Sequence, residues 1–405
     1  ILKRESFLNL SRSSYLFAKI TILLLISAIQ ALEYVIIGNT ILSIQGMTFY
    51  YWFALFSTFV FANMLGLNIS ATFDSAVTIY IMIPLIMIPL MTLGGAFFSF
   101  SKLNRKISSV DKVPLVAEFM QSRWAFEAMM VKQFKDNKFE KIFFYLDRDI
   151  SNSDFKMVHY IPELQDLLDE TINNIDYRDN EENANKDSLN QIIKQDLQLV
   201  HNEIRKELRL TGKYVPFDQI ENITPDNFNE DVYEKTQDYL SALKSYYGDV
   251  NFKRSSEKEA IKNEWANTNP GYYKDLRDKH TNEHIDDIVK NTYEKYKQLR
   301  YKDKLVRQAE PIYMEPDNSH WIGFRTHFYA YHKYFMGRYF DTYWFNMAVI
   351  WLMSILLYPP LYFEHFKKII GNLGGFSKLL SKKIKKINFD FVKKFLTLPK
   401  RNKDA

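Results

Sequence analysis

The chain has 405 residues, of which 25% are charged and 47% hydrophobic, and its formal net charge is +5. It contains no cysteine, which excludes disulfide bonds, thiolate zinc sites and cysteine nucleophiles. The apolar residues are concentrated towards the two ends of the chain, and the middle, roughly residues 101–339, is polar and rich in charge. This segregation predicts one membrane unit and one soluble unit.

Four apolar stretches are long enough to cross a bilayer, which takes roughly 20 residues in a helix. They are Tyr15–Gly38, Met47–Leu67, Val77–Phe98 and Tyr343–Phe363. We therefore expect an all-α integral membrane protein with four transmembrane helices. In the third stretch, Pro84 and Pro89 should kink or break the helix, and Gly94 and Gly95 should allow another helix to approach closely.

Polar residues inside these stretches are candidates for function, because placing them in lipid is costly. Gln30 and Glu33 lie in the first stretch and Asn63 lies in the second. Together with Pro84 and Pro89 they form a set that lines a substrate pathway or serves helix packing. The sequence leaves these two alternatives open. For Glu33, about five residues from the end of its stretch, a side chain that simply reaches the membrane interface is a further alternative.

The segment between the third and fourth stretches, residues 101–339, should form a large and mainly helical insertion. Apolar residues recur there at helical spacing, and sustained alternation at period two is scarce. The three apolar stripes are Ile161, Leu164, Leu168, Ile172 and Ile175; Leu189, Ile193, Leu197, Val200, Ile204 and Leu208; and Ile285, Val289, Tyr293, Tyr296 and Leu299. A polar segment, DYRDNEENANKD, separates the first two stripes as a helix connection would.

Basic residues predict which side of the membrane each part occupies. From Glu364 to Ala405, twelve Lys and Arg oppose three acidic residues, a net charge of 12 − 3 = +9. Three more precede the first stretch: Lys3, Arg4 and Arg12. Both termini are therefore expected in the cytoplasm and residues 101–339 outside it. Three residues after the third stretch argue weakly for the opposite orientation: Lys102, Arg105 and Lys106.

These expectations divide the chain into five parts. They are a cytoplasmic element (1–14), three transmembrane helices (15–100), an extracytoplasmic helical domain (101–339), a last transmembrane helix (340–365) and a basic cytoplasmic tail (366–405). Because the tail directly follows a membrane span, its charge favours anionic lipid over nucleic acid as its partner. Its mixture of lysines and apolar residues is compatible with a helix on the inner leaflet or with disorder.

Motifs for catalysis are not evident in the sequence. The Gly212–Lys213 pair is followed by Tyr214, whereas a phosphate-binding P-loop needs Ser or Thr there. His320, His327 and His332 are seven and five residues apart, which does not align three rings on one helix face for zinc. We expect no catalytic residue and no metal site, and therefore no enzymatic activity of this chain by itself.

The membrane part resembles ABC-2 type permeases of the ABCG (White) class. The stretch KRESFLNLSRSSYLFAKI, from Lys3 to Ile20, resembles the element before their third transmembrane helix, with matches at Arg4, Glu5, Tyr15 and Ala18. The Pro-containing third stretch and then SRWAFEA, from Ser122 to Ala128, resemble the fifth helix and its external re-entrant continuation. The resemblance covers about residues 1–140 and 340–365, and the domain between them is much longer than in familiar members.

This resemblance implies a permease that moves a substrate across the membrane, driven by ATP and Mg²⁺ on a cassette domain absent from these residues. It implies that Arg4 and Glu5 couple the permease to the cassette. It also places four residues in the external re-entrant motif: Ser122, Arg123, Trp124 and Glu127. Because the chain begins at Ile1 without a cassette, we expect it to be the C-terminal part of a longer chain.

The expected partners are the ATP-binding cassette domain, a second copy of the chain and the lipid bilayer, with no nucleic acid. The high content of Lys, Asn and Ile suggests a bacterial source, so the inner membrane is the expected location. The alternative function is a membrane-anchored sensor or binding protein whose external helical domain captures a ligand. The sequence does not distinguish among lipid, glycan, peptide and drug as substrates.

Overall fold

The computed structural model describes residues 11–73, 75–100, 103–104, 108–180, 185–316, 321 and 323–370. The described residues fall into two compact units. Those of the first unit lie within Ile1–Ala31, Phe56–Pro89 and Val349–Ala405, and those of the second lie within Leu32–Leu55 and Leu90–Ala348.

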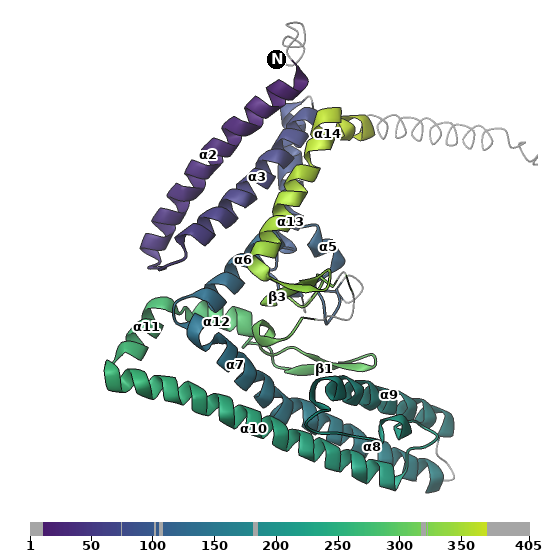
Figure 1. Cartoon of the computed structure of the whole chain (residues 1–405). Coiled ribbons are helices and arrows are strands. Elements are labelled where there is room, and N and C mark those ends of the chain that lie inside the picture. Colours follow the sequence, from purple (N-terminus) through teal and green to yellow (C-terminus); the bar gives the residue numbers. More distant parts are fainter. Residues whose placement is uncertain are drawn as a thin grey trace, which may run out of the picture. The chain divides into compact units, whose positions relative to one another are not determined.

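Long apolar helices supply three candidate membrane spans in the described part of the chain. They are α2 (Arg12–Ile41), α3 (Thr48–Thr72), and α13 (Thr342–Leu356) continued by α14 (Tyr358–Phe363) (Figure 1). Their length and composition confirm three of the four predicted stretches as helices able to cross a membrane.

The predicted span Val77–Phe98 forms a shorter helix, α4 (Ala76–Thr92), of 17 residues. At 1.5 Å per residue this helix is about 26 Å long, somewhat short of a hydrocarbon core of about 30 Å. The chain leaves the helix before Gly95, whose φ is +81°. A Cβ at Gly95 would lie 2.6 Å from the Phe328 ring, so only glycine fits there. The count of four spans is therefore not confirmed.

Polar side chains inside the first unit form hydrogen bonds between segments. Asn68 on α3 donates from Nδ2 to the backbone oxygen of Leu357 at 2.9 Å. Trp351 on α13 donates from Nε1 to the Ser57 hydroxyl at 3.0 Å. A buried apolar cluster consists of Leu16, Met64 and Leu361. These bonds place polar groups against protein partners, which lowers the cost of holding them in an apolar surrounding.

The second unit contains the large helical domain. Its helices are α5 (Leu115–Glu118), α6 (Gln121–Asp136), α7 (Glu140–Phe155), α8 (Ile161–Asn180), α9 (Lys186–Thr211), α10 (Glu230–Thr268), α11 (Tyr272–His280) and α12 (Glu283–Lys290). A π-helical turn, η2 (Lys156–Tyr160), joins α7 to α8, and a 3₁₀ turn, η3 (Ile220–Asn222), precedes α10.

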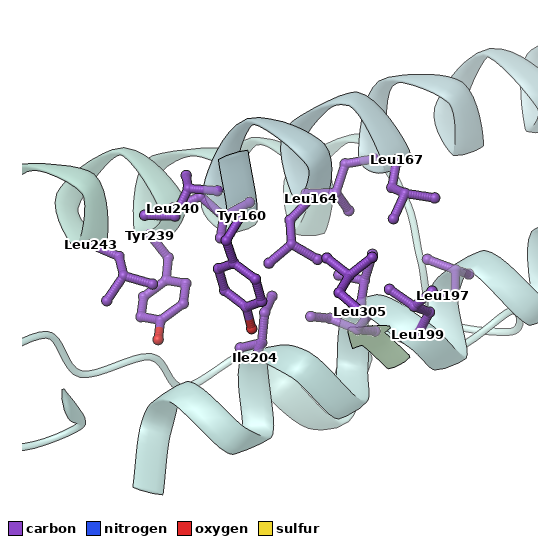
Figure 2. Close-up of a cluster of buried hydrophobic side chains, with 14 of the residues drawn as sticks. Tyr160, Leu164, Leu167, Leu197, Leu199, Ile204, Tyr239, Leu240, Leu243 and Leu305 are labelled. Carbon is purple, nitrogen blue, oxygen red and sulfur yellow. The ribbon is translucent and has the colours of Figure 1, made fainter. Parts of the chain in front are cut away.

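The apolar core of this domain lies between α8, α9 and α10 (Figure 2). The first predicted stripe contributes Leu164 and Leu168, and the second contributes Leu197 and Ile204, all fully buried. From α10, Leu240 packs into the same cluster. Both stripes are therefore confirmed as buried helix faces. Each buried leucine stabilises the fold by about 1.5–3 kcal/mol relative to an exposed one.

The third predicted stripe is wrong beyond α12. Ile285 and Val289 lie on that helix, as the spacing predicts. The helix ends because Asn291 adopts the left-handed conformation, with φ of +50°, that terminates many helices. Leu299, which the stripe places on the same helix, lies in a strand.

Two antiparallel hairpins make the all-α prediction incomplete. β1 (Gln298–Tyr301) pairs with β2 (Lys304–Arg307), and β3 (His332–Phe335) pairs with β4 (Arg338–Asp341). A 3₁₀ turn, η4 (Pro311–Tyr313), lies between the hairpins in sequence. Each strand has four residues, which is too short for the alternation that reveals strands in a sequence.

Candidate functional site

The predicted polar residues of the spans have different surroundings. Gln30 and Glu33 are exposed on α2. Asn63 on α3 donates from Nδ2 to the Ser27 hydroxyl of α2 at 2.7 Å. This bond joins two helices of the first unit and favours the helix-packing alternative for Asn63.

Other predicted positions lie inside helices or outside the described residues. Pro84 and Pro89 are in the interior of α4, where neither can donate a backbone hydrogen bond. Arg4 and Glu5, the predicted coupling residues, lie outside the described residues, and so does the tail from residue 371 onward.

The predicted re-entrant motif forms the first half of α6. Arg123 and Glu127 are four residues apart and therefore lie on one face of the helix. Both side chains are 0% exposed, and Arg123 Nη1 lies 3.4 Å from Glu127 Oε2. On the same helix, the Ser122 hydroxyl donates to the backbone oxygen of Leu90. The structure therefore makes this short motif the centre of a buried charged cluster.

Glu127 is the member of the cluster with the most partners. Its Oε1 accepts from Lys333 Nζ at 2.8 Å and from the backbone nitrogen of Tyr329 at 3.2 Å. Its Oε2 accepts from Asn346 Nδ2 at 2.9 Å. Lys333 comes from β3 and Asn346 from the first turns of α13. A single carboxylate thus joins α6, the β3–β4 hairpin and the start of α13.

Arg123 lies between two carboxylates and over an aromatic ring. Its Nη1 is 3.4 Å from Glu118 Oε2, and its Cζ is 3.9 Å from the centroid of the Trp124 ring. The Trp124 indole donates to the backbone oxygen of Glu118 at 2.8 Å. The guanidinium therefore has negative charge and a π face around it, both of which favour a buried cation.

The two carboxylates respond differently to burial. Burial alone would raise the pKa of Glu127, but attraction to Arg123 and Lys333 outweighs it and holds this pKa below its usual range. Burial raises the pKa of Glu118, and its attraction to Arg123 only partly offsets that shift. Glu127 is therefore the more acidic of the two carboxyls, and it is the one that contacts both buried cations.

The other end of α6 also contacts the first turns of two candidate spans. Lys132 lies over the Tyr50 ring at 4.3 Å and pairs with Asp136 at 2.5 Å. Tyr343 at the start of α13 donates from its hydroxyl to the backbone oxygen of Tyr50 at 2.7 Å. Lys135 pairs with Asp341, the last residue of β4, at 2.7 Å. The cluster offers no nucleophile activated by a base, and its geometry suits the positioning of helices.

Two of the three histidines considered for zinc, His327 and His332, lie in the described part of the chain. Burial and the nearby Lys333 lower the pKa of His327 to about 4, so that ring is neutral. Burial and Lys135 lower the pKa of His332 to about 4 as well, and His320 lies outside the described residues. Among the residues that the structure describes, no group of His, Cys, Asp and Glu is arranged to hold a metal ion.

Sequence reasoning missed three members of the buried cluster. Asn346 carries the same signal as Asn63, a polar side chain in an apolar stretch, and that signal could have identified it. Lys333 follows a histidine in a segment rich in aromatic residues, and nothing in the sequence distinguishes it from a lysine on the surface. Glu118 lies in a short segment without periodicity, so no pattern marks it.

Comparison with known proteins gives one family match. Residues 1–134 match the family model described as ABC-2 type transporter, which is 134 of 405 residues. The matched part includes α2, α3 and α4 and ends on α6 at Phe134, so it contains Arg123 and Glu127. No curated protein and no solved structure matches the chain. The match supports the resemblance to ABC-2 permeases for this part of the chain.

Proposed function

We propose that this chain is the permease portion of an ABC-2 type transporter, which moves a substrate across a membrane using ATP hydrolysed elsewhere. The observation that carries the proposal is the match of residues 1–134 to the ABC-2 type transporter family. The match includes two of the three helices in the described part of the chain that are long and apolar enough to cross a membrane. It gives no support to the alternative of a membrane-anchored sensor.

The chemistry of such a transporter resides in its ATP-binding cassette. ATP and Mg²⁺ would bind to that domain, on the same longer chain or on a separate subunit. The residues of this chain would bind substrate and move, and Arg4 and Glu5 would contact the cassette. The resemblance in Lys3–Ile20 supports this role and the finer assignment to the ABCG class.

Pairing and orientation complete the proposal. Two copies of the permease would form one pathway, with both termini in the cytoplasm and the large helical domain outside. The net charge of +9 in residues 364–405 supports this orientation, because short basic segments stay on the cytoplasmic side. The proposed location is the inner membrane of a bacterium.

Within this transporter we assign the buried cluster on α6 a mechanical role. Glu127 binds Lys333 of the β3–β4 hairpin and Asn346 of α13 at the same time. A displacement of the start of α13 would therefore be passed to α6, and through the short connection at residues 137–139 to α7. The helical domain would follow movements of the last span, which ATP binding at the cassette would drive.

The proposal is tested by isolating the native protein from its own membranes in mild detergent. We expect a polypeptide with a P-loop to be present, fused to this chain or bound to it, together with vanadate-sensitive ATP hydrolysis. A preparation that retains the chain at full yield but has no such polypeptide and no ATPase activity would overturn it.

Orientation has a separate test that uses the absence of native cysteine. Ser188→Cys on α9 should react from outside intact cells with a membrane-impermeant thiol reagent. Ser381→Cys in the basic tail should react only after the cells are opened. The reverse pattern would contradict the proposed orientation and leave the family assignment intact.

A further inference from the structure

The β3–β4 hairpin has no linker between it and a candidate membrane span. Strand β4 ends at Asp341, and α13 begins at the next residue, Thr342. The helix formed by residues 342–363 is long and apolar enough to cross a membrane. Figure 1 shows β3 beside the start of α13. If α13 crosses the bilayer, the hairpin is held at the level of its surface.

Large apolar side chains are exposed around this hairpin. Met336 at its turn is 53% exposed, Phe340 on β4 is 42% exposed, and Trp344 in the first turn of α13 is 48% exposed. Trp321 is 65% exposed, and its backbone oxygen accepts from Met336 N at 2.9 Å, so these two residues are neighbours. Monomeric soluble surfaces rarely gather such side chains without a partner.

Further aromatic rings pack against the hairpin and the start of α13. Phe345 on α13 lies 5.8 Å from Phe335 and 6.3 Å from Phe340, measured between ring centroids. Phe324 contacts both Phe335 and Phe345. Aromatic side chains therefore pack the hairpin against the start of α13.

The β1–β2 hairpin of the same chain provides a comparison. Both hairpins have four-residue strands and a turn residue with positive φ, +56° at Lys302 and +51° at Met336. At β1–β2 the turn residues are Lys302 and Asp303, and Asp303 Oδ2 accepts from Asn202 at 3.0 Å. A polar turn is therefore compatible with this geometry. Asn and Gly are favoured at positive φ and methionine is not, so the backbone conformation of the turn does not explain why residue 336 is methionine.

We propose that the β3–β4 hairpin, with Trp321 and Trp344, inserts into the interfacial layer of the bilayer on the side of the large helical domain. Its partner is a phospholipid surface. Trp and Tyr are enriched in the parts of membrane proteins that lie at the membrane–water interface. Exposed Arg338, which directly follows the turn residues Met336 and Gly337, can extend its guanidinium to lipid phosphates. The inference depends on α13 crossing the membrane and is independent of ATP-driven transport.

A fluorescent reporter tests this contact directly in the full chain. Met336→Cys is labelled with an environment-sensitive nitrobenzoxadiazole dye and the protein is placed in phospholipid nanodiscs. Lys302→Cys, at the turn of the other hairpin, is the matched control. Ile355→Cys, exposed on α13, reports whether that helix is in lipid. Quenching is measured with lipids carrying doxyl groups near the headgroup and with aqueous iodide.

We expect a loss of fluorescence from the dye at Met336 with doxyl lipids and little loss with iodide. The dye at Lys302 should show the opposite pattern, and the dye at Ile355 should be quenched by doxyl lipids. Quenching of the Met336 dye by iodide alone would overturn the proposal. Protection from both quenchers would overturn it too, because it would show that protein, such as a second copy, covers the hairpin. An unquenched dye at Ile355 would overturn the membrane placement on which the inference depends.

Discussion

Replacing Glu127 by Gln should destabilise the second unit strongly. The carboxylate, Arg123 and Lys333 are all 0% exposed, so the variant removes the negative charge that both buried cations contact. Removing one member of a buried ion pair costs about 3–5 kcal/mol, because the remaining charge stays desolvated. The same change at Glu118 should cost clearly less, because burial raises the pKa of that carboxyl and disfavours its charge.

The assay is thermal unfolding of the full chain in detergent, followed by tryptophan fluorescence. At about 2 °C per kcal/mol for a large unit, Glu127→Gln should lower Tm by about 6–10 °C. Lys333→Met added to Glu127→Gln should recover part of the loss, since it removes one uncompensated cation. Lys235→Met, which breaks an exposed pair with Asp231, is the control and should leave Tm unchanged.

The pH dependence of this deficit has a defined sign. The pKa of Glu127 is lower in the folded state than its ordinary value, so its stabilisation is present above that value. The stabilisation is lost as pH falls through the folded pKa, and the gap between wild type and Glu127→Gln should narrow in acid. Equal Tm values for wild type and Glu127→Gln at neutral pH would show that the buried ion pairs of Glu127 do not stabilise this unit. An equal loss of Tm in Glu118→Gln would contradict the difference between the two carboxyls.

Three further predictions address other parts of the chain. Burial and nearby Asp147 raise the pKa of Glu140 to about 7. Because burial disfavours the ionised carboxyl in the folded state, Glu140→Gln should be more stable than wild type by about 1–3 kcal/mol at pH 8. The difference should disappear below about pH 4, where the carboxyl is protonated in both the folded and the unfolded state, as measured by denaturant titration. Leu164→Ala, at a fully buried core position, should cost about 2–5 kcal/mol in the same titration, and a loss below about 1 kcal/mol would contradict the packing. The double variant Arg4→Ala and Glu5→Ala should keep its yield but lose most substrate-independent ATPase activity of the assembled transporter, and unchanged ATPase would exclude the coupling role.

Most of the helical structure of this chain could be predicted from the periodic spacing of its apolar residues. Leu164 and Leu197 lie on stripes in which apolar residues are three and four positions apart. This spacing places them on one face of a helix whatever that face packs against, so their burial follows from the pattern. The periodicity fails at Asn291, where one residue with positive φ ends the helix and the apolar pattern continues into a strand. Apolar spacing alone does not contain that backbone choice.

The candidate site could be predicted only in part, for a similar reason. Arg123 and Glu127 lie four residues apart on one helix, so their pairing is local and readable in the sequence. Lys333 and Asn346 reach the same carboxylate from more than two hundred residues away. No local pattern relates such distant positions, and the contact depends on how the hairpin and α13 pack against α6.

Distances between two copies of the chain test the transport proposal most directly. A single spin label at Ser11→Cys, at the start of α2, reports the separation of the two copies in the assembled transporter by pulsed electron resonance. We expect one intersubunit distance without nucleotide and a shifted distance distribution after ATP and vanadate are added. With the label placed instead at Ser188→Cys on α9, the change in intersubunit distance caused by ATP and vanadate should be smaller in the Glu127→Gln variant than in the wild type. A monomer without an intersubunit distance, or a distance distribution that ATP and vanadate leave unchanged, would contradict the proposed transport function.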